Sequence, residues 1–196
     1  MVYISNGNRR MNIPTFSLVS EHTCPNATKL CKKYCYAKKA EKYYKNPFIS
    51  RMTNTFDTLK ATFINEMKNA ISRKDSKYIR IHESGDFYSQ EYLLKWFKIC
   101  EFFPNKQFLV YTQMFNLDWT NKPQNMVVYW TIWPDTEAIP NSGLKAFVVD
   151  NGKGMIPKYK FKVAGHKCKK GKGSKLTCDS CLYCFEGKGN VLFKIH

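Results

Sequence analysis

Three cysteines near the start of the 196-residue chain are the residues whose spacing most directly suggests chemistry. Cys24, Cys31 and Cys35 fall within twelve residues, with spacers of six and three residues between them. Thiolates grouped in this way usually hold a metal ion or an iron–sulfur cluster. Three thiolates are one short of a closed four-thiolate site. The pattern therefore leaves two alternatives: a fourth ligand from elsewhere in the chain, or a coordination position that is open to a ligand or substrate.

A second group of cysteines lies near the other end of the chain. Cys178, Cys181 and Cys184 are separated by two residues each, and Cys168 is the obvious fourth ligand. Two-residue spacers allow consecutive thiolates to turn towards one centre, so this group predicts either an iron–sulfur cluster or a structural zinc ion. Because this set is complete, the first three cysteines need no ligand from it, which favours an open position there. The eighth cysteine, Cys100, is interpreted as a core residue on the apolar side of a predicted helix.

A third feature is the polar run at residues 82–87, which follows a predicted strand and precedes a predicted helix. Ligands bind at the carboxyl ends of strands in α/β folds, so we expect this run to contact a ligand; a simple helix-capping loop is the alternative. Gly85 permits close approach of the backbone, and its neighbours offer hydrogen-bond acceptors. Thr112, Gln113 and Asp135 occupy similar places after later strands, where each could equally serve packing.

Helices alternating with strands must position these residues. Apolar residues at helical spacing predict a helix over residues 53–73 and another from about residue 89 to a stop at Pro104. Short apolar runs predict strands at residues 78–81, 107–112, 126–132, 145–149 and 191–195. This order predicts an α/β fold with a largely parallel sheet. The connection that follows the second of these strands is short and shows no helical pattern.

Composition places the chain among globular proteins that do not cross a membrane. Apolar residues make up 43% of the sequence, and no apolar run approaches the roughly 20 residues that span a bilayer. The N-terminal residues do not have the pattern of a secretory signal peptide. We therefore expect a cytoplasmic protein with reduced cysteines, in which clustered cysteines are more often metal ligands than disulfide partners.

The chain is strongly basic, with 32 Lys and Arg residues, 15 Asp and Glu residues and a net charge of +17. Residues 29–45, which could form a helix, contain seven lysines and one glutamate. Residues 151–178 contain nine lysines and no acidic residue. This charge favours a polyanionic partner, so we expect contact with nucleic acid or a nucleotide. A solvated lysine-rich surface is the alternative.

Together these motifs resemble the gene product 88 family of phages and plasmids. The resemblance rests on Cys-Pro-Asn-Ala-Thr from Cys24, on Leu-Cys at Cys31 and Cys-Tyr-Ala at Cys35, and on Arg-Ile-His-Glu-Ser-Gly-Asp-Phe over residues 80–87. The C-terminal cysteine run also agrees, and the similarity spans roughly residues 12–190. It implies a protein that is encoded by a phage or plasmid and acts in a bacterial host cell.

A more distant resemblance is to the radical S-adenosylmethionine (SAM) superfamily. In that superfamily three cysteines of one loop hold three irons of a [4Fe–4S] cluster, and SAM binds the fourth iron. Tyr34 holds the place of an aromatic residue that commonly precedes the third cysteine, and residues 84–86 correspond to the glycine-rich motif that holds the SAM amino group. Spacers of six and three residues here replace the usual three and two. The SAM contacts that this resemblance implies are Tyr34, His82, Glu83, Ser84, Gly85, Asp86, Thr112 and Gln113.

The radical SAM resemblance also implies a fold and an activity. The fold is a partial, incomplete TIM-like β/α barrel over residues 1–164, with a cysteine-rich, cluster-binding segment over residues 165–196 packed on it. The activity is cleavage of SAM, in partnership with an electron donor, to act on a substrate for which nucleic acid or a nucleotide is expected. The SAM-type [4Fe–4S] cluster would be held by Cys24, Cys31 and Cys35, and an auxiliary [4Fe–4S] cluster, or alternatively zinc, by Cys168, Cys178, Cys181 and Cys184.

Two other functions are compatible with the same residues. The chain could be a non-enzymatic basic module that zinc or an iron–sulfur cluster stabilises and that binds nucleic acid or another partner. It could also be a redox carrier between two clusters, although this leaves residues 82–87 without a role.

Overall fold

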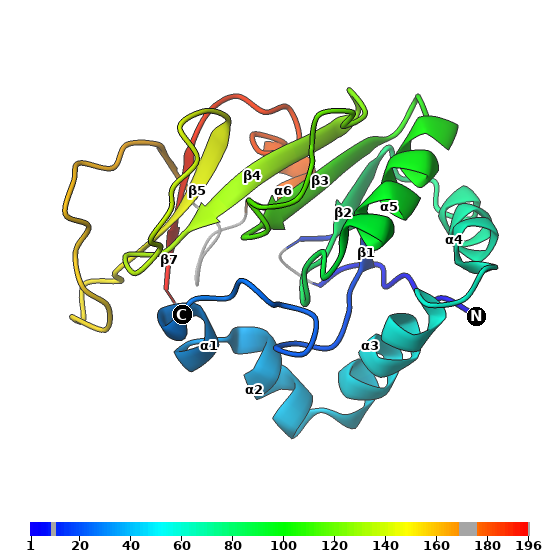
Figure 1. The fold of residues 1–196 in the computed structure, drawn as a ribbon, viewed down its shortest axis with the longest axis horizontal. Helices are drawn as coiled ribbons and strands as arrows, with labels where there is room; N and C mark the ends of the chain where they lie inside the picture. Colours follow the sequence, from blue (N-terminus) through cyan, green and yellow to red (C-terminus); the bar gives the residue numbers. More distant parts are fainter. Residues whose placement is uncertain (9–10, 169–175, 196) are drawn as a thin grey trace.

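A computed structural model describes residues 1–8, 11–168 and 176–195 of the chain. Its helices and strands occur in the order drawn in Figure 1. They are β1 (Thr15–Phe16), α1 (Lys29–Lys33), α2 (Tyr36–Tyr43), α3 (Lys45–Asp57), α4 (Phe63–Ser72), β2 (Tyr78–Ile81), α5 (Gln90–Phe102), β3 (Gln107–Thr112), β4 (Met126–Ile132), β5 (Leu144–Val149), β6 (His166–Lys167), α6 (Cys178–Cys181) and β7 (Val191–Lys194).

A seven-stranded sheet forms the centre of the molecule, and its strands lie in the order β1-β2-β3-β4-β5-β7-β6. Every strand pairing in it is parallel; on β2 and β3, for example, Ile79 lies opposite Phe108. The first five strands are neighbours in chain order. Because the strands are parallel, their carboxyl ends meet at one edge of the sheet. The predicted α/β fold with a largely parallel sheet is confirmed, and β2, β3 and β4 have the predicted bounds.

Both faces of the sheet are covered, by different parts of the chain. Side chains alternate between the faces, so that Ile79 belongs to one apolar core and Leu109 to another. Helices α4 and α5 pack side by side on the first face (Figure 1), to which they contribute Phe63 and Trp96. The C-terminal segment covers the second face through Phe185. The strand β7 from this segment pairs with β5, so residues on both sides of position 165 share one sheet.

Loops replace helices in three of the strand connections. The fully described stretches from β3 to β4, from β4 to β5 and from β5 to β6 contain no helix, as the sequence predicted for the first of them. Trp119 of the β3–β4 loop packs against Phe87 and Phe97 at ring-centroid distances of 5.5 and 6.1 Å. The indole therefore covers a part of the first face to which a helix could otherwise have packed.

The single helix predicted over residues 53–73 is wrong, because the chain forms α3 and α4 there. Phe56 and Leu59 of the expected apolar stripe are 60% and 67% exposed. Phe63, Met67 and Ile71 of α4 are buried as expected. The inward side of α3 is polar instead, and the buried Asn54 side chain hydrogen-bonds the backbone of the N-terminal segment. The helical spacing of apolar residues therefore combined positions on the buried side of α4 with positions that are exposed in and just after α3.

No helix among the described residues is long and apolar enough to span a lipid bilayer. Within the predicted cysteine-rich segment, residues 169–175 and 196 lie outside the described residues.

Candidate functional site

The three-cysteine loop (residues 24–35) lies across the carboxyl ends of the central strands. The backbone N–H of Leu30 donates a hydrogen bond of 2.9 Å to Oδ2 of Asp135, which follows β4. The Tyr34 hydroxyl donates a hydrogen bond of 2.7 Å to the carbonyl oxygen of Met155, which follows β5. These long-range bonds fix the loop at the edge where α/β proteins bind their ligands.

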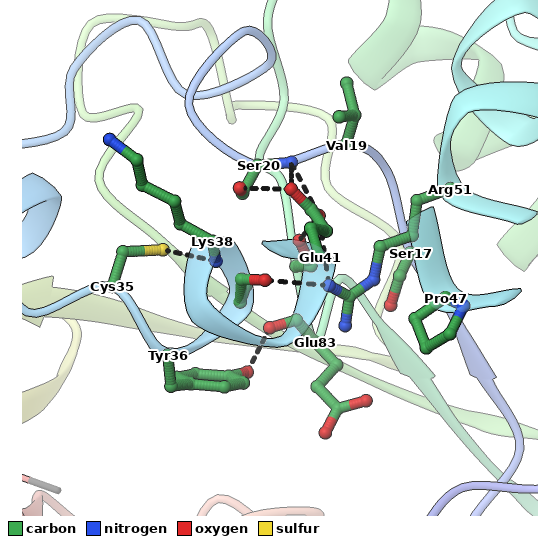
Figure 2. Close-up of polar contacts among 12 residues, drawn as sticks. Ser17, Val19, Ser20, Cys35, Tyr36, Lys38, Glu41, Pro47, Arg51 and Glu83 are labelled. Atoms are coloured by element: carbon green, nitrogen blue, oxygen red, sulfur yellow. Dashed lines mark hydrogen bonds and ion pairs between the residues drawn. The ribbon is translucent and has the colours of Figure 1, made fainter. Parts of the chain in front are cut away.

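Two short helices set the positions of the second and third cysteines. The Thr28 hydroxyl caps α1 by accepting a hydrogen bond of 3.1 Å from the backbone N–H of Cys31. Cys35 caps α2 with its own side chain, and its Sγ accepts a hydrogen bond of 3.4 Å from the backbone N–H of Lys38 (Figure 2). This cap fixes the position of the Cys35 sulfur at the start of α2.

The three thiols are half-buried and interact electrostatically. Burial raises the pKa of Cys24 to about 12, and the charges of Asp86 and Cys31 add to the effect. Burial also raises the pKa of Cys31 to about 11, against the opposing effect of a hydrogen bond from Gln113. Thiols of this kind remain protonated at neutral pH unless a metal displaces the proton.

Residues 1–8, 11–168 and 176–195 contain no group of three or more His, Cys, Asp and Glu side chains arranged to hold a metal ion. A single zinc ion draws its four ligands around one point, whereas the cysteines of a four-iron cluster bind different irons and lie farther apart. The described thiols are not gathered around one point as the ligands of a single zinc ion are.

Two buried acceptors beside Cys31 lack a hydrogen-bond donor. The Gln113 side chain donates from Nε2 to the Cys31 Sγ at 3.2 Å, while its Oε1 is buried and has no partner among the described residues. Asp135 accepts from Leu30 with one carboxylate oxygen, but its Oδ1 is also buried and unpaired in the described chain. Buried polar atoms nearly always have partners in native proteins. The arrangement is therefore suited to a ligand that donates hydrogen bonds next to Cys31.

Asp86 connects the ends of two neighbouring strands. Its carboxylate accepts hydrogen bonds from the Thr112 hydroxyl at 2.6 Å and from the backbone N–H groups of Gln113 at 2.9 Å and Phe87 at 2.8 Å. Burial raises its pKa to about 6, and these three hydrogen bonds oppose the rise. The predicted residues Asp86, Thr112 and Gln113 are thus in direct contact, although Asp86 and Thr112 act on each other and only Gln113 touches a cysteine.

Glu41 of α2 anchors the loop after β2 to the rest of the site, as Figure 2 shows in part. Its carboxylate accepts hydrogen bonds from the Ser20 hydroxyl at 2.6 Å and from the Ser84 hydroxyl at 3.3 Å. Arg51 of α3 forms an ion pair with it at 3.0 Å, and only 10% and 9% of the Arg51 and Glu41 side chains are exposed. Ser84, a predicted ligand contact, is therefore engaged with Glu41 and holds its loop in place.

Glu83 and His82 both form hydrogen bonds with other residues of the described chain. The Glu83 Oε1 accepts a hydrogen bond of 2.8 Å from Asn8, and its carbonyl oxygen accepts one from the Tyr36 hydroxyl (Figure 2). The His82 ring lies in the aromatic core, with Nε2 hydrogen-bonded to the Tyr92 hydroxyl at 2.8 Å. Burial lowers the pKa of His82 to about 3, so the ring is neutral. Its side chain packs in the core, contrary to the expected contact with a ligand.

The C-terminal cysteines are brought together on the second face of the sheet. A cavity of about 100 Å³ is lined by Cys168, Cys178, Cys181 and Cys184. Burial raises the pKa of Cys184 to about 11, while a hydrogen bond with Tyr111 lowers it. The four residues predicted from spacing thus share one cavity, which has the donor chemistry of a four-thiolate metal site.

Arg80 of β2 lines the same cavity. Its guanidinium carbon lies 4.1 Å from the centre of the Tyr111 ring, and its Nε donates to the carbonyl oxygens of Ile81 and His82. No carboxylate in the described part of the chain forms an ion pair with it. Its charge lowers the pKa of Cys184. Arg80 is therefore a half-buried cation available to a negatively charged group in the cavity.

The sequence interpretation missed Glu41, Arg51 and Arg80. Two of them could have been recognised as unusual from the sequence. Glu41 is the only acidic residue in the lysine-rich stretch over residues 29–45, and Arg80 is a charge between the apolar residues of a short strand. Nothing in the sequence marked Arg51 as a buried residue, because an arginine in a basic helix is ordinarily exposed.

Comparison with known proteins gives a family and two relatives. The family described as "Gene product 88" matches residues 3–187. A "Gene 88 protein" from Mycobacterium phage L5 is 30% identical over 198 residues, which cover 87% of this chain and 81% of the relative. A "Gene 88 protein" from Mycobacterium phage D29 is 29% identical over 199 residues, with the same coverage of both chains. No solved structure matches the chain.

Proposed function

The chain belongs to the Gene product 88 family, as its sequence motifs predicted, and we propose that its three-cysteine loop holds a [4Fe–4S] cluster at which SAM binds. The relatives are phage proteins, which agrees with the expected phage origin. The proposal itself rests on the site, and one observation carries it. Gln113 Oε1 and Asp135 Oδ1 are buried acceptors that find no donor among the described residues, next to a set of three thiols.

The amino group of SAM supplies the donors that these two oxygens lack. In this arrangement Cys24, Cys31 and Cys35 would hold the cluster. Gln113 and Asp135 would accept hydrogen bonds from the SAM amino group and so orient SAM over the loop. When bound, the cluster would supply the electron for reductive cleavage of SAM.

The surrounding chain positions these groups and excludes water. Asp86 ties the β2 end to the β3 end and so fixes Gln113. The Glu41–Arg51 pair and Ser84 hold the loop after β2 against α2. The order of β1 to β5, which follows the chain, supports the partial β/α barrel as the scaffold of this site.

The four C-terminal cysteines belong to the same proposal, as ligands of an auxiliary [4Fe–4S] cluster. Four thiolates carry more negative charge than the metal centre neutralises. Arg80 lines the cavity, pairs with no carboxylate of the described chain, and would offset part of the remaining charge. An external electron donor completes the proposed system.

The test is anaerobic purification of the full chain with iron, sulfide and zinc analysis. Electron paramagnetic resonance of the reduced protein is recorded with and without SAM. We expect iron and sulfide, a spectrum that SAM changes, and SAM cleavage that is abolished in Cys31→Ala. Cys100→Ala is the matched control, because Cys100 is buried away from both cysteine groups and should leave iron content unchanged. SAM cleavage that persists in Cys31→Ala would overturn the assignment.

A second function is favoured by the packing of the C-terminal cavity. Cys178 and Cys184 pack against the same apolar core as Phe185 and Val191, so a metal there would fasten the last strand to the sheet. In this alternative the chain is a basic, zinc- or cluster-stabilised binding module without catalysis. Zinc alone, with no response to SAM, would support it against the first proposal.

A further inference from the structure

We propose that the outer surface of α2 and the start of α3 binds single-stranded nucleic acid. This lysine–tyrosine surface (residues 32–48) presents four large exposed rings, those of Tyr36, Tyr43, Tyr44 and Phe48. The Tyr43 and Tyr44 side chains are the most open, at 73% and 64% exposure. Exposed rings that gather in one short segment mark an interaction site more than single scattered ones do.

The same surface carries positive charge that the described residues do not neutralise. Its exposed lysines are Lys32, Lys33, Lys38, Lys39, Lys42 and Lys45. Only Lys38 forms an ion pair within the described chain, with Glu21 at 2.9 Å. The single acidic residue of the segment, Glu41, points inward to Arg51 (Figure 2). The carboxylates described next to this surface come from other segments, namely Glu21, which pairs with Lys38, and Glu83, which lies beside Tyr36.

The fold keeps these rings and lysines outside. The buried side of α2 consists of Ala37 and the largely buried Glu41, whose pairing with Arg51 fixes the rotation of the helix. Helices α1 and α2 follow one another along the lower edge of the molecule (Figure 1), where no strand lies outside them. The Tyr36 hydroxyl bonds the Glu83 carbonyl oxygen and Lys38 pairs with Glu21, while the other rings and lysines of this surface are exposed in the described chain.

The interleaving of rings and lysines favours a single strand of nucleic acid over other polyanions. The Lys42 Nζ lies 6.0 Å from the Tyr43 ring centre, and the Lys33 Nζ lies 5.2 Å from the Tyr34 ring centre. Bases stack on rings while lysines contact the adjoining phosphates, and only unpaired bases can stack in this way. An interfacial membrane helix needs a continuous apolar side, whereas the outer side of α2 is mainly lysine.

This surface extends the proposed function without depending on it. It begins at Lys32, between the second and third cysteines, so a bound strand would pass the three-cysteine loop. The charges and rings that carry the inference need no metal. We therefore expect Cys31→Ala, which removes a proposed cluster ligand, to bind nucleic acid as the wild type does. Failure of the cluster proposal and failure of this inference are thereby distinguishable.

The experiment measures the fluorescence anisotropy of labelled oligothymidylate and oligouridylate as increasing amounts of the full chain are added. The oligonucleotides have about 20 nucleotides, which is longer than the usual binding site of 4–16 nucleotides. One variant combines Tyr43→Ala with Tyr44→Ala, and another combines Lys39→Gln with Lys42→Gln. The matched control combines Lys98→Gln with Phe102→Ala on α5, which removes an exposed lysine and a 56% exposed ring elsewhere. Circular dichroism confirms that every variant is folded.

We expect the tyrosine variant to bind roughly 5- to 150-fold more weakly for each ring that stacks on a base. The lysine variant should reduce the slope of log Kd against log salt concentration by about 0.7 for each phosphate that a replaced lysine had neutralised. The α5 control should match the wild type. Equal weakening in the control and the tyrosine variant would overturn the inference. So would absence of oligonucleotide binding, or binding to anionic vesicles that oligonucleotide does not displace.

Discussion

The side-chain amide of Gln113 donates a hydrogen bond of 3.2 Å to the thiol of Cys31, which lies 82 residues earlier in the chain. This bond joins the end of β3 to the three-cysteine loop. It also fixes the amide so that its oxygen is buried with no donor in the described part of the chain. The candidate site is thus defined by a strand end as much as by the cysteines.

Replacing Gln113 with Glu tests this bond in the metal-free protein. The substitution keeps the shape but exchanges a donor for a negative charge, so the pKa of Cys31 should rise above its value of about 11. Less thiolate is then present, and alkylation of Cys31 by iodoacetamide at about pH 9 should be slower than in the wild type. Mass spectrometry resolves the rate at each cysteine, with Cys181 as the internal control. An unchanged or faster rate at Cys31 would contradict the expected effect.

Glu41→Gln should destabilise the fold strongly. It leaves the Arg51 guanidinium, whose side chain is only 10% exposed, without its carboxylate partner. Breaking a buried pair in this way costs about 3–5 kcal/mol in the free energy of unfolding. Urea denaturation measures the decrease. Lys38→Gln on the same helix breaks the more exposed pair with Glu21 and should cost less than about 1 kcal/mol. Similar decreases in the two variants would argue against Glu41 as the anchor of α2.

Gly85→Ala should destabilise more than Gly152→Ala, although both glycines have positive φ, at 83° and 95°. A Cβ at Gly85 would lie 2.6 Å from both the Leu18 Cβ and the Thr23 Oγ1, whereas one at Gly152 would meet nothing within 4 Å. Backbone strain costs about 1–2 kcal/mol in each variant. Overpacking adds about 1–3 kcal/mol at Gly85 alone. Thermal and urea denaturation compare the two, and equal destabilisation would show that the loop can move away.

His82 should make stability depend on pH below neutrality. Its pKa is about 3 in the folded protein and near 6.5 when unfolded, so the unfolded state binds the extra proton between these values. The contribution of His82 is therefore fully present above about pH 6.5 and falls by roughly 1.4 kcal/mol per unit as the pH drops towards 3. His82→Asn, which tolerates the positive φ of 60°, should remove this slope.

Asp86 changes the free energy of unfolding with pH in the direction opposite to His82. The contributions of the two residues must therefore be distinguished in that measurement. Burial raises the pKa of Asp86 from 3.8 to about 6, so its contribution is greatest at low pH and is lost as the pH rises through this range. The two effects partly cancel in the wild type. The informative quantity is the difference in free energy of unfolding between wild type and His82→Asn at each pH. A constant difference from about pH 4 to 7 would rule out the neutral, buried histidine.

Local sequence determined much of the framework. Short apolar runs predicted the bounds of β2, β3 and β4, because a strand is recognised from a few consecutive residues. Cysteine spacing predicted that Cys168 would join the three cysteines at residues 178–184, and all four share one cavity. The family followed from short motifs, because each of them is contiguous in the chain.

Tertiary structure decided the parts that depend on distant residues. The apolar spacing over residues 53–73 could not show that the inward side of α3 is polar, because Asn54 is buried by backbone groups far away in sequence. His82 and Ser84 are two residues apart, yet the first enters the aromatic core and the second contacts Glu41. The side chains around Cys31 gather only because parallel strands deliver their carboxyl ends to one edge of the sheet. The order of residues determines which donors and acceptors the chain possesses, whereas long-range packing determines which of them are left buried and unpaired.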